Sequence, residues 1–143
     1  MTRDADFTVD IRAGRLVEAR VRGLSTRDDA DAYGLAVAAA AQRAPAQPVL
    51  LADHRAVRVY PQPAADRLVE LFRPNNTRYA RIAVVVSPLN AILRMQLERL
   101  VREARSDHRR VCTDAETALD HLASSLDPRE LARARAFLAE LPA

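Results

Sequence analysis

The chain has 143 residues and a mass of 15.8 kDa, a size that fits one domain with a buried core. Apolar residues make up 49% of the sequence, which excludes general disorder, and the presence of only three glycines argues against a Gly-rich phosphate loop. All 22 basic residues are Arg and are interleaved with 19 acidic residues, so the net charge of +3 does not form the basic stripe that is typical of nucleic-acid binding.

Two segments near the N terminus alternate apolar and polar residues, as half-buried strands do. They span residues 7–12 and 17–22, and the short stretch between them contains Gly14. Residues 6–22 are therefore predicted to form a β-hairpin.

A helix and a buried strand are predicted next. The helix starts after Thr26, whose hydroxyl can cap it, and ends before Pro45. Residues 49–52 are a continuous apolar run, typical of a strand that is buried on both faces. Residues 57–60 also alternate, but they are too few to assign to a strand.

Prolines mark the predicted start and end of a helix in the middle of the chain. Pro61 and Pro63 are predicted to open a helix, Pro74 is predicted to stop it, and the two asparagines that follow are a turn signal. Residues 82–86 form a second buried strand. Ser87, followed by Pro88, is predicted to cap the next helix.

The predicted helix over residues 89–105 has a broad apolar face, which Ile92 and Met95 extend sideways. We favour core packing for these two side chains, with a homodimer or partner surface as the alternative. A short third strand follows at residues 110–113, and Thr113 with Glu116 predicts a capping box for another helix.

A last helix is predicted over residues 128–141, where it either docks on its own domain or packs against a second copy. The order of elements predicts one α/β domain over residues 1–143, with a mixed sheet covered by helices. Its parts are the hairpin at residues 6–22, strand–helix units at residues 26–126, and the extra C-terminal helix.

Three pieces of the chain support a family resemblance: residues 15–19 in the hairpin, residues 51–55 at the end of a strand, and residues 110–114 with Ala118 and Leu119. With these pieces, nearly the whole chain resembles the SpoIIAA-like branch of the STAS (anti-sigma-factor-antagonist-like) proteins, including bacterial proteins labelled STAS/SEC14. The resemblance implies a regulatory or interaction module without chemistry of its own.

The chain departs from the signalling members of that family at one motif. In those members, the turn after the equivalent strand carries an Asp-Ser-Ser-Gly-like motif, in which a partner kinase phosphorylates one serine. Here Asp53 matches the Asp, but His54 and Arg55 stand in place of the serines, and no serine occurs between Ser25 and Ser87. The resemblance therefore does not carry the phosphorylation switch to this chain.

Ligands of open α/β sheets favour the crevice beyond the carboxyl ends of parallel strands. Polar residues follow three predicted strands: Asp53, His54 and Arg55 follow the first, Ser87 and Asn90 the second, and Thr113 and Asp114 the third. The candidate ligand- or partner-binding residues are Asp53, His54, Arg55 and Asn90.

Two interpretations of the residues that follow the first strand are open. In the functional one, His54 takes up a proton near neutral pH, Asp53 orients it and Arg55 holds an anion. In the structural one, Asp53 caps the following turn, Arg55 pairs with a nearby acid, and His54 faces water. We favour the structural interpretation because caps and exposed pairs are common at such ends.

Several kinds of site have little support. The three histidines lie far apart, and with the single cysteine, Cys112, they offer no ligand spacing, so we expect no metal and no cofactor. Ser87 lacks the surroundings of a nucleophile, and Cys112 is expected to be a buried small hydrophobe. We predict no catalytic residue.

The compartment is predicted from the absence of targeting signals. The first six residues are rich in charge, so we expect no signal peptide, and no apolar run approaches the ~20 residues of a membrane helix. One cysteine allows no internal disulfide. We expect a cytoplasmic protein that does not insert into a membrane and does not bind nucleic acid.

The favoured hypothesis is a non-enzymatic interaction module that forms a homodimer and binds a protein partner near Asp53–Arg55 and the adjoining helices. The alternative is a binder of a small anionic or lipid-like ligand in the strand-end crevice, with Arg55 as its anchor. An enzyme would rest only on the pair of Asp53 and His54.

Overall fold

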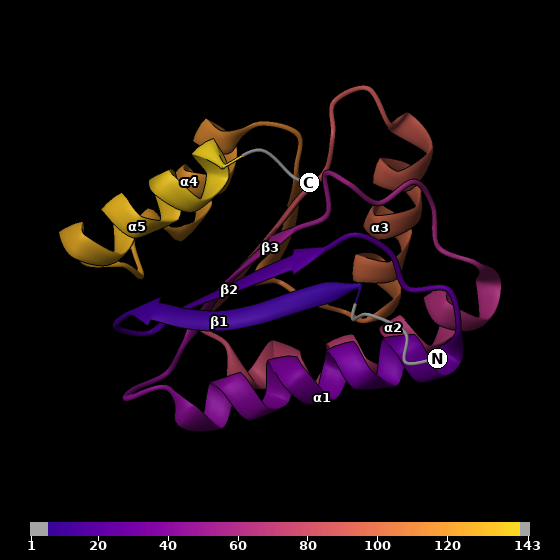
Figure 1. The fold of residues 1–143 in the computed structure, drawn as a ribbon, viewed down its shortest axis with the longest axis horizontal. Helices are drawn as coiled ribbons and strands as arrows, with labels where there is room; N and C mark the ends of the chain where they lie inside the picture. Colours follow the sequence, from indigo (N-terminus) through magenta and orange to yellow (C-terminus); the bar gives the residue numbers. More distant parts are fainter. Residues whose placement is uncertain (1–5, 141–143) are drawn as a thin grey trace.

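The computed structural model describes residues 6–140 and shows a five-stranded sheet (Figure 1). The strands lie across the sheet in chain order; the first pair is antiparallel and every other pair is parallel. The predicted α/β class with a mixed sheet is thereby confirmed. The strands are β1 (Phe7–Ala13), β2 (Leu16–Val21), β3 (Val49–Asp53), β4 (Arg81–Val85) and β5 (Arg109–Cys112).

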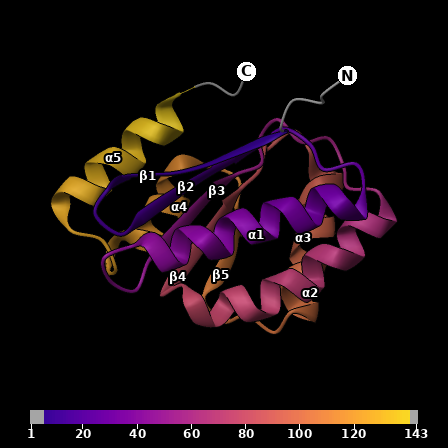
Figure 2. The ribbon, with the colours of Figure 1, turned by 60° about the horizontal axis from the view of Figure 1, so that its bottom comes forward.

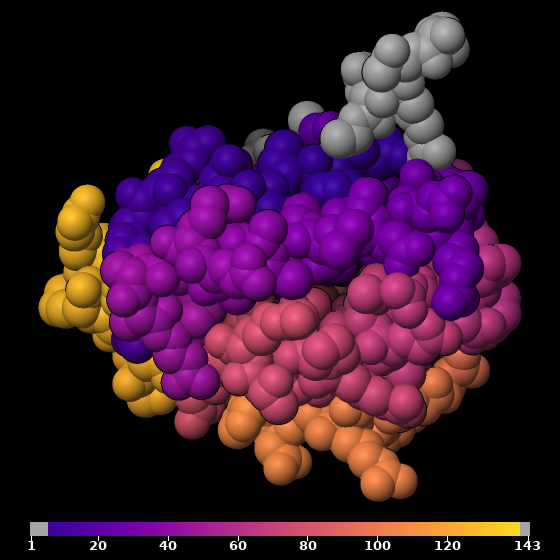
Figure 3. Space-filling view, turned by 90° about the horizontal axis from the view of Figure 1, so that it is seen from below, coloured from indigo at the N-terminus to yellow at the C-terminus, as the bar shows by residue number. Residues whose placement is uncertain are grey.

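Helices cover both faces of the sheet (Figures 1 and 2). Right-handed crossovers between strands taken in order place their helices on a single face. That face carries α1 (Arg27–Arg43), α2 (Gln62–Arg78) and α3 (Ala91–Glu103), while α4 (Ala115–Ala123) and α5 (Pro128–Ala139) cover the other. Figure 3 looks onto α1 and α2, which lie side by side.

The central strand β3 has apolar cores on both sides. Leu50 and Ala52 pack beneath α1, α2 and α3, whereas Val49 and Leu51 pack beneath α4 and α5. All five residues of β3 are buried, which confirms the interpretation of the continuous apolar run.

The predicted hairpin is also confirmed. Gly14 lies in its turn with φ of 51°, a left-handed conformation that glycine adopts without steric cost. The carboxylate of Glu130, at the start of α5, lies directly against this glycine and accepts a hydrogen bond of 2.7 Å from the backbone N–H of Arg15. A side chain at position 14 would displace that carboxylate.

The predicted end of the second helix at Pro74 is wrong, because α2 continues to Arg78. Pro74 removes one helical hydrogen bond, and tertiary contacts of the next turn compensate for it. The buried Asn76 donates to the Ala104 carbonyl (3.2 Å) and accepts from Arg109 Nε (3.3 Å). The predicted turn is therefore a buried helical turn.

Two helix starts differ from the prediction. Asn90, rather than Ser87, is the N-cap of α3, and the Ser87 hydroxyl accepts from the Leu89 N–H (3.2 Å) in the preceding turn. Asp114, rather than Thr113, caps α4 by accepting from the Thr117 N–H (2.8 Å). In each case two residues that can cap a helix lie close together in the sequence. The cap at Thr26 is confirmed.

The expectation that Ile92 and Met95 pack in the core is wrong. The two side chains are 71% and 67% exposed, because the buried face of α3 is formed by Leu93, Leu97 and Leu100, and Ile92 and Met95 lie off that face.

The C-terminal helix docks on its own domain, against α4 and the first two strands. It ends at Ala139, and the predicted extension to Leu141 lies outside the described residues. Within residues 6–140, no helix combines the length and the apolar character that crossing a membrane requires.

Candidate functional site

The carboxyl ends of β3, β4 and β5 meet at one edge of the sheet, but the polar residues that follow them do not converge on one crevice. Asp53 faces the layer of α4 and α5, His54 enters the core on the opposite face, and Asn90 caps α3. The four candidate residues therefore serve three separate structural purposes.

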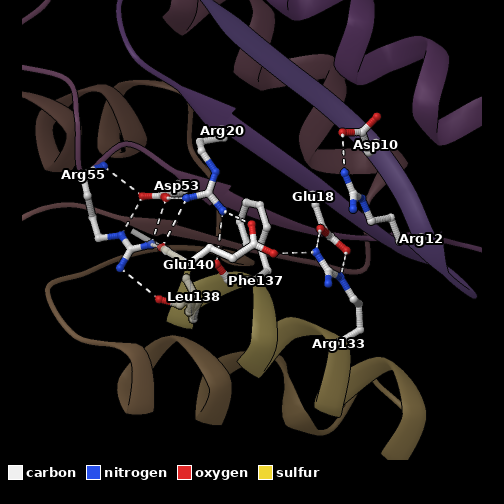
Figure 4. A network of polar contacts seen from close by, with 10 residues as sticks. All are labelled: Asp10, Arg12, Glu18, Arg20, Asp53, Arg55, Arg133, Phe137, Leu138 and Glu140. Atoms are coloured by element: carbon white, nitrogen blue, oxygen red, sulfur yellow. Dashed lines mark hydrogen bonds and ion pairs between the residues drawn. The ribbon is translucent and has the colours of Figure 1, made fainter. Parts of the chain in front are cut away.

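Asp53 is fully buried and is surrounded by two arginines (Figure 4). Its carboxylate accepts from Arg20 Nη1 at 2.8 Å, and from Nε, Nη2 and the backbone N–H of Arg55 at 2.9 to 3.0 Å. Asp53 thus caps its turn and Arg55 pairs with an acid, as the structural interpretation predicts.

The same two arginines bind the C-terminal end of α5. Arg20 Nη2 donates to the Phe137 carbonyl (3.1 Å), and its guanidinium lies 4.2 Å from the centre of the Phe137 ring. Arg55 donates to the carbonyls of Leu138 and Glu140, each at 3.0 Å. Cations stabilise the unpaired carbonyls at a helix C terminus, so Arg20 and Arg55 link α5 to the buried carboxylate.

A second ion pair extends this arrangement along α5. Arg133 forms a two-point contact with the buried Glu18, through Nε at 2.7 Å and Nη2 at 2.8 Å. These hydrogen bonds raise the pKa of the Arg133 side chain. Glu140 bridges the two parts, since its carboxylate pairs with Arg20 (3.1 Å) and Arg133 (3.2 Å). We call this network the α5 clasp: Glu18, Arg20, Asp53, Arg55, Arg133 and Glu140.

The prediction that His54 faces water is wrong, because the residue is only 2% exposed. Its Nδ1 lies 2.6 Å from the Tyr60 hydroxyl, and the rings of Tyr33 and Tyr60 stand edge-on to it. Burial lowers the pKa of His54 to about 4, although the nearby Asp53 carboxylate raises it. The imidazole is therefore neutral near pH 7.

The pair that would support proton transfer is not assembled. No hydrogen bond joins Asp53 to His54 in the described part of the chain, and each side chain is bonded on its own face of the sheet. Arg55, the expected anion anchor, uses Nε and both terminal nitrogens within the α5 clasp.

Asn90 holds the segment after β3 against the start of α3. Its Oδ1 accepts from the Leu93 N–H (3.0 Å), and its Nδ2 donates to the carbonyls of Val57 (3.2 Å) and Arg58 (2.8 Å). Gln96, one turn and a half further along α3, exchanges two hydrogen bonds with the backbone of Tyr60 (2.8 and 3.0 Å). The loop of residues 54–61 is thereby fixed.

Sequence reasoning missed the charged partners of the clasp on β2 and α5. A signal was present, since Leu16, Glu18 and Arg20 share one face of a strand whose Leu16 is in the core. Charged residues on a buried face require partners. Arg133, the partner of Glu18, and the α5 carbonyl that accepts from Arg20 lie more than 110 positions away, where no local pattern connects them.

Cys112 is buried, as expected, and burial raises the pKa of its thiol to about 11. Among residues 6–140, no three His, Cys, Asp or Glu side chains gather into a group that could hold a metal ion.

Comparison of the chain with protein-family models, curated proteins and solved structures found no match.

We predict that Asp53→Asn destabilises the fold by about 3 to 5 kcal/mol, because it leaves Arg55 without an anion and Arg20 with only the half-exposed Glu140. Urea unfolding measures the loss, and hydrogen exchange of residues 128–139 should accelerate as α5 loosens. Asp10→Asn is the matched control, since Asp10 forms an exposed pair with Arg12 at 3.9 Å and should cost no more than about 1 kcal/mol. Equal losses in the two variants would contradict a central role for Asp53.

We predict that His54 makes stability depend on pH. Its pKa falls from 6.5 to about 4 on folding, so only the unfolded chain takes up the proton between these values. The contribution is complete above pH 6.5 and is lost as the pH falls towards 4, by roughly 3 kcal/mol in total.

Urea titrations between pH 7.5 and 4 measure this slope. His54→Phe should flatten it relative to the wild type, while His108→Gln, at an exposed position, should retain it. Identical slopes for the wild type and His54→Phe would exclude His54 as the source.

Proposed function

We propose that the chain is a non-enzymatic interaction module, similar to the SpoIIAA-like STAS proteins, that binds a protein partner through one face of α3. The observation that carries the proposal is an exposed apolar stripe at helical spacing. Ile92 and Met95 are 71% and 67% exposed and lie three residues apart on α3, and Leu89, which is 95% exposed, lies in the turn just before the N-cap Asn90. Val59, from the loop after β3, adds a fourth exposed apolar side chain.

The stripe borders a surface groove of about 370 Å³. We call it the α3 groove; it is lined by Val59, Gln62, Ile92, Met95, Gln96, Arg99 and Arg102. Contiguous apolar side chains framed by polar ones are typical of protein–protein contact surfaces. Burial of a large aliphatic side chain such as Ile92 or Met95 contributes about 1.5 to 3 kcal/mol, which is enough to support specific binding.

The charges around the groove favour one kind of partner. Arg99 pairs with Glu103 only at the exposed surface (3.5 Å), and Arg102 has no acidic partner within the described residues. A segment that presents apolar side chains flanked by carboxylates would match both the stripe and its rim. An amphipathic helix laid along α3 has this chemistry.

The proposal moves the contact surface from the strand end to the adjoining helix. The hydrogen-bonding groups of Asp53 and Arg55 are committed to the α5 clasp, whereas the loop that follows them delivers Val59 to the groove. Such a module, with one buried thiol, suits the reducing cytoplasm.

Ile92→Asp combined with Met95→Asp is expected to abolish partner capture without unfolding the protein, because both side chains are exposed. The tagged wild type and the variant are compared in capture from the cells of origin, and the captured protein is then titrated in purified form. Its affinity should fall by at least 10-fold, the effect of about 1.4 kcal/mol.

Leu35→Asp is the matched control, since Leu35 is 69% exposed but lies on α1. A partner that is lost equally from both variants, or retained by both, would contradict the assignment of the α3 groove. If the purified wild type instead forms a dimer that the double variant cannot form, the occupant is a second copy, and the proposal of a different protein partner fails.

A further inference from the structure

Arg109, the first residue of β5, is a buried cation without a counter-ion in the described part of the chain. It is 7% exposed and points into the layer of α1, α2 and α3, where its guanidinium lies 3.9 Å from the centre of the Phe72 ring. Its Nε donates to Asn76 Oδ1 (3.3 Å). Across residues 6–140 no carboxylate pairs with it.

The charge remains on Arg109 near neutral pH, since burial lowers its pKa only to about 10. A buried charge without a partner is costly, and the contact with Phe72 offsets only part of that cost. The structural task of Arg109, support of Asn76, uses one of its five N–H donors. The two terminal nitrogens, with four donors, have no acceptor among the described residues.

Two further donors line the same hollow. The Tyr33 hydroxyl has no hydrogen-bond partner in the described chain, and burial raises its pKa to about 12, so it remains protonated. Asn75 accepts from Arg78 through Oδ1 (3.0 Å), while its Nδ2 has no acceptor among the described residues. No unpartnered side-chain atom is completely sealed within the described structure, so these donors reach solvent through the hollow.

The hollow opens between α1 and α2, on the face that Figure 3 shows. Its walls are apolar: Val37, Leu50, Leu68, Leu71 and Phe72. A Cβ atom at Gly34 would lie 2.7 Å from Leu71 Cδ1, so the absence of a side chain there lets Leu71 close over the mouth. The open space of about 10 Å³ has room for about one water molecule.

We propose that this hollow binds the carboxylate of a small aliphatic acid, which accepts hydrogen bonds from Arg109 and Tyr33. The single negative charge of a carboxylate matches the single cation, and its two oxygens match the fork of a guanidinium. The hollow itself has room only for the carboxylate group, and the aliphatic chain leaves it between α1 and α2 once Leu71 turns aside. The site is at the amino end of β5, and it differs from the strand-end crevice in which Arg55 was expected to hold an anion.

Octanoate is the probe, and octanamide is its uncharged counterpart. Octanoate should raise the Tm of the wild type and shift the NMR signal of the Arg109 Nε–H group, and octanamide should bind far more weakly. Arg109→Met should weaken octanoate binding roughly 10- to 100-fold, and Tyr33→Phe roughly 2- to 10-fold, as expected for a charged and a neutral hydrogen bond.

Arg110→Gln is the matched control, because Arg110 is the neighbouring residue on β5 and is exposed. It should leave octanoate affinity unchanged. Equal binding to the wild type and Arg109→Met, or no binding to the wild type, would overturn the proposal.

A second variant guards against misfolding of Arg109→Met. Leu71→Trp fills the mouth of the hollow from a half-buried position and leaves Arg109 in place. It should abolish both octanoate binding and the shift of the Arg109 signal. Retention of full affinity in Leu71→Trp would exclude the hollow as the site. The proposal is independent of the partner surface on α3, which these variants leave intact.

Discussion

The carboxylate of Asp53 holds two arginines at the end of β3, and both arginines extend to the last carbonyls of α5. Each charged group in this arrangement depends on the others for its charge or hydrogen-bond partners. Without Asp53, two guanidinium groups would lie close together with no anion between them. Without α5, the same groups would lose the acceptors for their remaining N–H donors. Together with the Glu18–Arg133 pair and the apolar packing of Phe137 and Leu138, this buried charge fixes the position of the C-terminal helix on the sheet.

The difference between Asp53 and Arg109 separates a structural charge from a candidate binding group. Both are buried, and both lie at the end of a strand. Asp53 is paired with Arg20 of β2 and with Arg55 of the loop after β3, so its charge is satisfied within the fold. Arg109 has an aromatic ring and one amide oxygen, and its terminal donors face a hollow. A fold that leaves a buried charge without an internal partner has a place for a hydrogen-bond acceptor from a bound ligand.

Much of the fold could be predicted because its signals are local. The continuous apolar run of β3, the alternation of the hairpin and the cap at Thr26 each depend on residues within a few positions of one another. After a strand has ended, the face of the sheet against which the next residue packs does not depend on its sequence neighbours alone. His54 enters the core because Tyr33 and Tyr60 surround it there, and the spacing around position 54 carries no sign of either ring.

The candidate site was harder to predict for a related reason. Asp53 and Arg55 were correctly expected to cap and to pair, since that interaction spans two positions. The link from Glu18 to Arg133 spans 115 positions, and it forms only because α5 returns to the first strands. Arg109 belongs to a short basic run that resembles a surface patch in the sequence. Only the register of β5 shows that Arg109 points inward and Arg110 outward.

The helices on the two faces of the sheet are joined by different kinds of ion pair. The layer of α4 and α5 is fastened by buried, multiply bonded ion pairs. Between α1 and α2 the ion pairs lie at the surface, where Arg67 contacts Asp31 and Arg27 contacts Glu70. Surface pairs resist separation weakly, so they add little to the apolar packing that holds these two helices together. A ligand that enters the hollow therefore displaces apolar side chains such as Leu71 rather than breaking a buried ion pair, and it meets there the remaining donors of Arg109 and Tyr33.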